Sequence, residues 1–237
     1  MGTSGSTDFL VTGTDIVKGA LRALTVIATG ETPEASEIAD GLQALNMMIK
    51  QWMAPSNPLA PGLKIFQREE KTLTLAAKAT YELQPSGGDL DVAVPVKILS
   101  AVLRNTDNQD IPLSPMTMEQ YYRITGKSET GTPSGYYYER QLDTGYLYLD
   151  YIPSDTTDTI VMKILRVLED MDAAGNNPDF TQEWFRPLKF NLAIDLAPEY
   201  GKEVTKSLRD LAQESLYLAN SFHPETTDVY FQPGLDY

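Results

Sequence analysis

The chain has 237 residues, of which 42% are hydrophobic and 22% charged, as in an ordinary globular protein of one domain or two small ones. The absence of cysteine excludes disulfides, thiolate nucleophiles and cysteine-based metal centres, and a single histidine removes most histidine-ligated ones. The net charge of −14 argues against a surface that wraps the phosphate backbone of DNA, and no apolar run approaches the ~18 residues of a membrane-spanning helix. We therefore expect no metal, no cofactor and no membrane partner.

Residues 1–60 are predicted to form a helical hairpin. Two stretches repeat apolar residues every three or four positions, namely Ile16, Val17, Ala20, Leu21 and Leu24, and then Ile38, Leu42, Leu45, Ile49 and Trp52. Between them, Gly30 is interpreted as the stop of the first helix, Thr32 as the N-cap of the second, and Pro33 as its first residue. This hairpin is expected to supply half of a helical bundle.

Residues 61–180 change to a period of two, which predicts strands. We expect about six of them, near residues 72–75, 80–83, 94–103, 136–139, 146–151 and 159–165. One short helix is predicted over residues 117–124, capped by Ser114 or Thr117. This region is therefore expected to be an antiparallel β-rich insertion with one short helix.

Residues 181–220 return to helical spacing. One stripe consists of Trp184, Leu188, Leu192 and Leu196, and a second of Val204, Leu208, Leu211, Ser215 and Leu218. Pro198 and Gly201 separate them. The fold class predicted for the whole chain is mainly α with a β insertion, in which the N- and C-terminal helix pairs form one four-helix bundle-like core.

Two acidic pairs, Asp89 with Asp91 and Asp107 with Asp110, are candidates for glycoside hydrolysis. That reaction needs one acid kept protonated by burial, and all four residues stand in hydrophilic, turn-like surroundings. We therefore expect no catalytic site and no enzymatic activity.

The segment 169–175 resembles a calcium-binding EF-hand loop through Asp170, Asp172 and Gly175. Ala174 and Thr181 stand where two further ligands belong. A solvated acidic loop is the preferred interpretation.

Tyrosine occurs 13 times, mostly in the β-rich region. The residues could form a stacking platform for sugars or single-stranded bases, or they could pack a half-buried sheet. No basic residue is interleaved among Tyr146, Tyr148 and Tyr151, which favours packing.

Residues 221–237 are predicted to be an extended tail. They have neither helical nor strand periodicity, but they contain aromatic residues that cannot bury against one another. Docking on a partner and a disordered terminus are both open, and the aromatic content favours docking. The proposed docking residues are Phe222, His223, Tyr230, Phe231 and Tyr237. His223 is interpreted as an exposed or interface residue rather than a general base.

Several segments together resemble the head-to-tail adaptor family of short-tailed bacteriophages, also described as tail accessory or head completion factors. The resemblance lies in residues 14–24, 30–33, 39–52, 133–138 and 192–201. It implies a structural virion protein that forms a ring, normally of twelve copies, below the portal protein. Such a ring extends the DNA channel without binding DNA specifically and offers a platform to the next tail protein.

The same resemblance implies that the extended tail reaches the portal, and that the protein resides in the tail or neck of a virion after assembly in the host cytoplasm. Two alternatives remain open. One is a virion-associated peptidoglycan hydrolase that uses an acidic pair. The other is a stopper or head completion connector of another tail type.

Overall fold

A computed structural model describes residues 5, 9–53 and 67–221. The chain divides into two compact units. The helical unit combines the two ends of the chain, Met1–Ile65 and Glu169–Tyr237, and the sheet unit is the continuous segment Phe66–Leu168. Each unit has its own apolar core and is described separately below.

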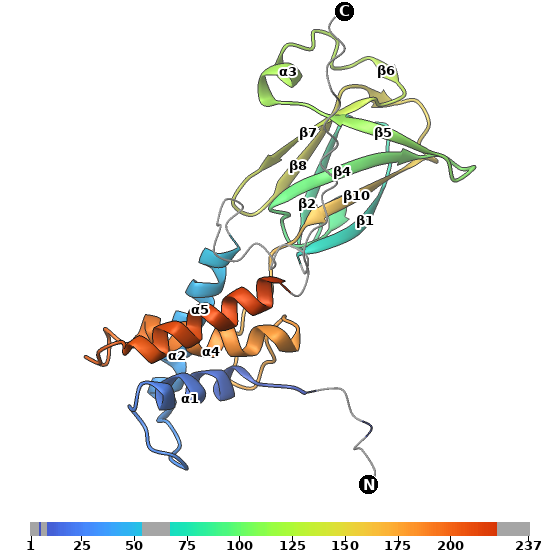
Figure 1. The fold of residues 1–237 in the computed structure, drawn as a ribbon. Coiled ribbons are helices and arrows are strands. Elements are labelled where there is room, and N and C mark those ends of the chain that lie inside the picture. Colours follow the sequence, from blue (N-terminus) through green and yellow to red (C-terminus); the bar gives the residue numbers. More distant parts are fainter. Residues whose placement is uncertain (1–4, 6–8, 54–66, 222–237) are drawn as a thin grey trace, which may run out of the picture. The chain divides into compact units, whose positions relative to one another are not determined.

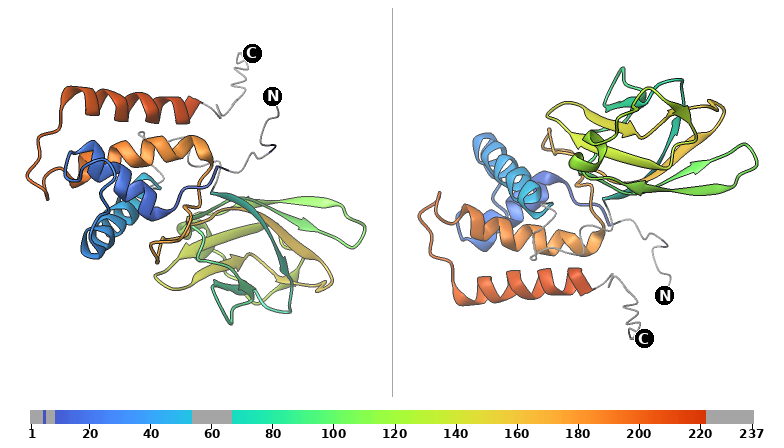
Figure 2. Two further views of the ribbon diagram at one scale, coloured as in Figure 1. Left: turned by 90° about the horizontal axis from the view of Figure 1, so that it is seen from below. Right: turned by 90° about the horizontal axis from the view of Figure 1, so that it is seen from above.

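The helical unit is built around α4 (Phe185–Leu196). This helix contacts α1 (Gly13–Ala23), α2 (Ala35–Trp52) and α5 (Lys206–Ser221), and it follows a 3₁₀ turn, η2 (Gln182–Trp184). Both views of Figure 2 show α4 lying between α5 and α1. The predicted stripe is confirmed, since its four members are fully buried: Trp184, Leu188, Leu192 and Leu196.

Glycines allow α1 and α2 to approach closely. A Cβ atom on Gly41 would lie 2.5 Å from Cγ1 of Val17, and one on Gly13 would lie 2.6 Å from Cδ2 of Leu42. Both distances are too short for van der Waals contact. A larger residue at Gly41 would displace Val17 of α1, and one at Gly13 would displace the end of the Leu42 side chain.

The ends of the hairpin helices differ from the prediction. A capping box of Thr12 and Asp15 begins α1, and the helix ends with Thr25 in the left-handed conformation (φ 56°) rather than at Gly30. The amide of Val26 donates to Leu21 O, which completes a Schellman motif. The N-cap of α2 is Glu34 rather than Thr32, so the assignment of Pro33 as the first helical residue is also wrong.

The sheet unit contains ten strands among the residues that the structure describes. Eight of them form one sheet in the order β1-β10-β4-β5-β7-β8-β2-β3, and β6 pairs with β9. The sheet curls into a nearly closed barrel around a core that includes Tyr81, Leu103, Leu147 and Ile160 (Figure 1). The strand bounds are β1 Arg68–Thr74, β2 Thr80–Gln84, β3 Leu90–Asp91, β4 Lys97–Arg104, β5 Asp110–Pro115, β6 Thr130–Gly131, β7 Gly135–Arg140, β8 Gly145–Leu149, β9 Ile152–Pro153 and β10 Thr159–Leu165.

The predicted fold class, mainly α with a four-helix bundle-like core, is wrong. A mixed eight-stranded sheet with its own core replaces the antiparallel insertion of about six strands that we expected. The helices also pack differently from a bundle, because α4 contacts each of the other three while α5 rests on α4 and η2. The buried side of α5 consists mainly of short side chains, namely Leu208, Ala212, Ser215 and Ala219.

The sheet is mixed rather than antiparallel. Strand β5 pairs with β7 in parallel, and β2 pairs with β3 in parallel. A short loop joins β2 to the two-residue β3, whereas the connection between β5 and β7 is a long crossover that contains α3 (Met118–Tyr122). This helix lies within the predicted segment and is capped by Thr117, as proposed. Strand β5 was not predicted, because Pro112 and Pro115 interrupt it and only Leu113 is buried, so it shows no apolar alternation.

Candidate functional site

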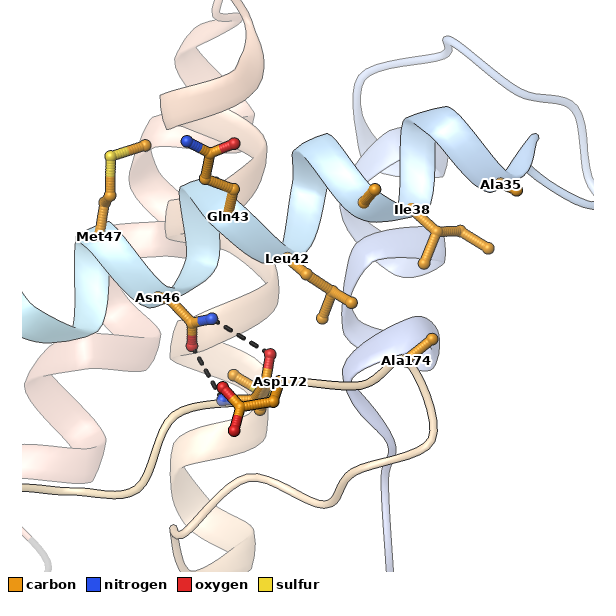
Figure 3. Close-up of a pocket in the computed structure, with 10 residues that line it drawn as sticks. Ala35, Ile38, Leu42, Gln43, Asn46, Met47, Asp172 and Ala174 are labelled. Carbon is orange, nitrogen blue, oxygen red and sulfur yellow. Dashed lines mark hydrogen bonds between the residues drawn. The ribbon is translucent and has the colours of Figure 1, made fainter.

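A groove of about 530 Å³ lies between α2 and the loop that precedes η2. Figure 3 shows Ile38 and Leu42 pointing towards the loop, while Gln43 and Met47 project away from it. Met47 is 58% exposed. Apart from Gln43, Asn46 and Asp172, the groove presents hydrocarbon and thioether groups, so it can receive an apolar side chain.

The loop wall of this groove is fixed to both helices of the hairpin. The side chain of Asn46 accepts from the Met171 amide (3.1 Å) and donates to the Met171 carbonyl (3.2 Å), as the dashed lines of Figure 3 show. Thr14 Oγ1 donates to Ala174 O at 2.7 Å, and Lys50 pairs with Asp170 at 2.6 Å. The acidic side chains of this loop are exposed, as the solvated interpretation expected, but its backbone is anchored; we call residues 170–174 the strap.

A pair of cations lies at the start of α4. The Nζ of Lys189 is 4.4 Å from the centroid of the Phe190 ring, and the Cζ of Arg186 is 5.7 Å from the same centroid. Partial burial lowers the pKa of Lys189, and the positive charge of Arg186 lowers it further. We call Arg186, Lys189 and Phe190 the basic patch.

Carboxylates gather beyond the other end of α4. Glu37, Asp40 and Glu199 all act on Tyr200, whose pKa is raised first by burial and then by these three negative charges. Asp40 and Glu199 are exposed, whereas Glu37 also accepts from the Glu34 amide at 2.8 Å in the cap of α2. We call Glu37, Asp40 and Glu199 the acidic patch.

Neither patch was found by the sequence reasoning. For the basic patch a signal does exist, because Arg186 and Lys189 are three residues apart and so share one side of a helix. In the acidic patch, Glu37 and Asp40 have the same spacing on α2, but no local signal links them to Glu199, which only the folded chain brings near them.

The tyrosines of the sheet unit stack on one another. The ring of Tyr137 is 5.6 Å from those of both Tyr121 and Tyr148, and Tyr146 continues the stack at 6.1 Å from Tyr148. Because these rings face each other, much of the surface that a stacking platform would offer is already covered. Burial raises the pKa of Tyr148 to about 12, so its hydroxyl is neutral at pH 7. Packing is therefore the better interpretation.

One end of this stack does carry a basic residue. The Nζ of Lys127 lies 4.2 Å from the ring centroid of Tyr121 and 4.4 Å from that of Tyr122. Lys127 comes from the connection after α3 and is not interleaved among the tyrosines of the strands, so the strand pattern gives no sign of it.

The candidate catalytic carboxylates are held in turns and ion pairs. Asp89 pairs with Lys78, and Asp91 accepts from the Gly88 amide. Asp110 makes a bidentate pair with Arg104 at 2.7 and 2.8 Å, and this pair lowers the pKa of Asp110. A general acid requires the opposite shift.

Asp107 lies in the same turn as Asp110. Its amide donates to the side chain of Asn105, whose carbonyl oxygen also accepts from the amide of Gln109. These bonds shape the turn between β4 and β5, which explains the polar composition of this segment.

Asp150 is a buried carboxylate that the sequence did not single out. It is 8% exposed and accepts from the amide and the hydroxyl of Ser134 and from the amide of Tyr151. These donors hold the start of β7 against the end of β8. Asp150 therefore has a structural role.

The residues proposed for partner docking in the tail, Phe222, His223, Tyr230, Phe231 and Tyr237, lie outside the described residues. In the described ranges, no group of three histidine, cysteine, aspartate or glutamate side chains is arranged to hold a metal ion. None of the helices described is both long and apolar enough to span a membrane. No family model matches the chain, and no curated protein is significantly similar to it.

Proposed function

We propose that the chain is a structural subunit of a phage head-to-tail connector. In this proposal it assembles with further copies into a ring below a portal protein and presents a platform to a downstream tail protein. DNA passes through the ring without specific binding. The proposal also places the protein in the virion and assigns it no enzymatic activity.

The observation that carries the proposal is where three of the five resembling segments lie. Residues 14–24 and 39–52 form most of α1 and α2, and residues 192–201 form the end of α4 and the turn after it. These stretches are far apart in sequence but bury their apolar side chains in one core, which includes Leu21, Leu45, Ile49, Leu192 and Leu196. A shared helical core is a physical reason for this spaced pattern to recur in a protein family.

Charge gives further support. A net charge of −14 repels DNA phosphates, which suits the wall of a conduit better than a DNA-binding surface. The candidate acids for hydrolysis are engaged in ion pairs and turns, so the geometry favours a connector over a hydrolase.

The test is binding to the purified cognate portal protein. Complex mass would be measured for the full chain and for a chain that lacks residues 221–237. We expect a multi-copy ring on the portal for the full chain and weaker binding for the truncated one. If the full chain never binds the portal, the connector proposal fails. If truncation changes nothing, only the role of the tail is wrong.

A further inference from the structure

The basic patch is preformed on the helical unit. A Cβ atom on Gly19 of α1 would lie 2.7 Å from Cδ of Lys189, so the missing side chain gives the lysine stem its place against α1. The Phe190 ring lies beside both cationic groups. Holding two like charges close together and partly buried is unfavourable, as the lowered pKa of Lys189 reflects. An arriving carboxylate would relieve this repulsion.

The charges of α4 are also separated by sign along the helix. Arg186 and Lys189 stand in its first half, while Asp195 stands in its last turn and Glu199 just past its end. This separation lets each side meet opposite charge on another molecule.

A second copy of the same chain supplies that opposite charge. The basic and acidic patches lie near opposite ends of α4, which at 12 residues is about 18 Å long. They are different surfaces, so a contact between them is heterologous: each copy uses one patch on one neighbour and the other patch on the next. Contacts of this kind close into rings or continue as filaments.

We propose that the basic patch of one copy, Arg186, Lys189 and Phe190, docks on the acidic patch of the next copy, Glu37, Asp40 and Glu199. This inference rests on the proposed connector function for its biological setting, and it names the contact that would close the ring. The contact depends on charge and can be measured without a portal.

The experiment uses two full-length charge-reversal variants. The first carries Arg186→Glu and Lys189→Glu, and the second carries Asp40→Lys and Glu199→Lys. Glu37 is left unchanged because it caps α2. In either variant alone, both patches have the same sign and repel. We expect the apparent dissociation constant for self-association to rise roughly tenfold or more in each, by sedimentation velocity across a concentration series.

The decisive sample is an equimolar mixture of the two variants. Each patch of the first variant is then complementary to a patch of the second, so copies can alternate around the assembly. We expect the mixture to associate within about threefold of the unmodified chain. Association of the unmodified chain should also weaken as salt is raised.

Matched controls place the same charge changes on exposed residues of the sheet unit. One control carries Arg123→Glu and Arg140→Glu, and the other carries Glu119→Lys and Asp143→Lys. They change the net charge equally but leave both patches intact, so they should associate as the unmodified chain does. Circular dichroism of every variant checks that the helices are retained.

The same samples are then mixed with the portal protein. If the two charge-reversal variants still form multi-copy rings on it, the proposed contact is wrong and the connector function stands. If the chain self-associates through the two patches but never binds the portal, the contact is right and the connector function is wrong. If copies associate neither alone nor on the portal, or if the mixture fails to restore association, the contact is overturned.

Discussion

The two units of this protein differ in how their charged side chains are arranged. On the sheet unit, bases and acids pair across neighbouring strands and turns, as in Lys163 with Glu70 at 2.9 Å and Arg104 with Asp110 at 2.7 Å. The helical unit has the pair of Lys50 with Asp170, but its basic patch and its acidic patch stand apart along α4. Charges paired within a chain serve its own structure, whereas charges kept apart are available to another molecule.

The largest effect expected from a single change is in the helical core. If the separated charges of the helical unit serve another molecule, its apolar core must supply its own stability. Trp184 is fully buried and its ring lies 6.1 Å from that of Trp52. Trp184→Ala should lower the free energy of unfolding by about 3–5 kcal/mol, because it removes a large buried aromatic side chain. Urea denaturation, with hydrogen exchange in α1 and α5, measures the loss.

A matched change on the surface is Leu218→Ala. Leu218 lies on α5 and is 50% exposed, so its removal should cost well under about 1 kcal/mol. If both substitutions lower the free energy of unfolding by the same amount, the apolar core is not what stabilises the helical unit.

A second prediction contrasts one cation from each unit. Lys189→Met keeps the apolar stem of the side chain but removes its charge from the crowded start of α4. We expect the free energy of unfolding to rise by less than about 1 kcal/mol, since the charge of Lys189 is partly buried and lies beside that of Arg186. Arg104→Met should instead lower it, because Asp110 loses its bidentate partner. Urea denaturation at pH 7 measures both changes. If the two substitutions shift the free energy of unfolding in the same direction, the proposed difference between the two units is wrong.

The smallest effect is a dependence on pH. Arg104 lowers the pKa of Asp110 in the folded chain, first through their hydrogen bonds, so this carboxyl is more acidic folded than unfolded. Its contribution to stability is therefore complete above the unfolded pKa of about 4 and is lost as the pH falls through the lower folded value. The difference between the unmodified chain and Arg104→Met should shrink between pH 5 and pH 3. A difference that stays constant over this range would show that the pair does not act through Asp110.

The sequence predicted local elements well and their arrangement poorly. The four long helices, the short helix after Thr117 and most of the longer strands follow from periodicity and capping, because those signals are local. The fold class was wrong for reasons that are not local. The two prolines of β5 remove the local signal of a strand. The parallel pairing of β5 with β7 depends on a crossover connection, which no short sequence pattern predicts.

The candidate surfaces were hidden for the same kind of reason. In the sequence, Arg186 and Lys189 look like ordinary surface residues. Only the structure shows that the stem of Lys189 packs against Gly19 of α1. Glu199 joins Asp40 only because the segment after α4 returns to α2. Single residues and their spacing were visible in the sequence, but which of them meet was decided by tertiary contacts.

The strap has a consequence for the order in which the chain folds during synthesis. Its bonds join residues that are 125 positions apart, Asn46 and Met171, and 160 positions apart, Thr14 and Ala174. The hairpin therefore leaves the ribosome long before α4 exists to cover its apolar stripe, whereas the sheet unit is continuous and can complete its pairing as soon as residue 168 has emerged. The hairpin is thus among the last of these segments to be buried, and its apolar stripe stays exposed in the nascent chain until α4 has been made.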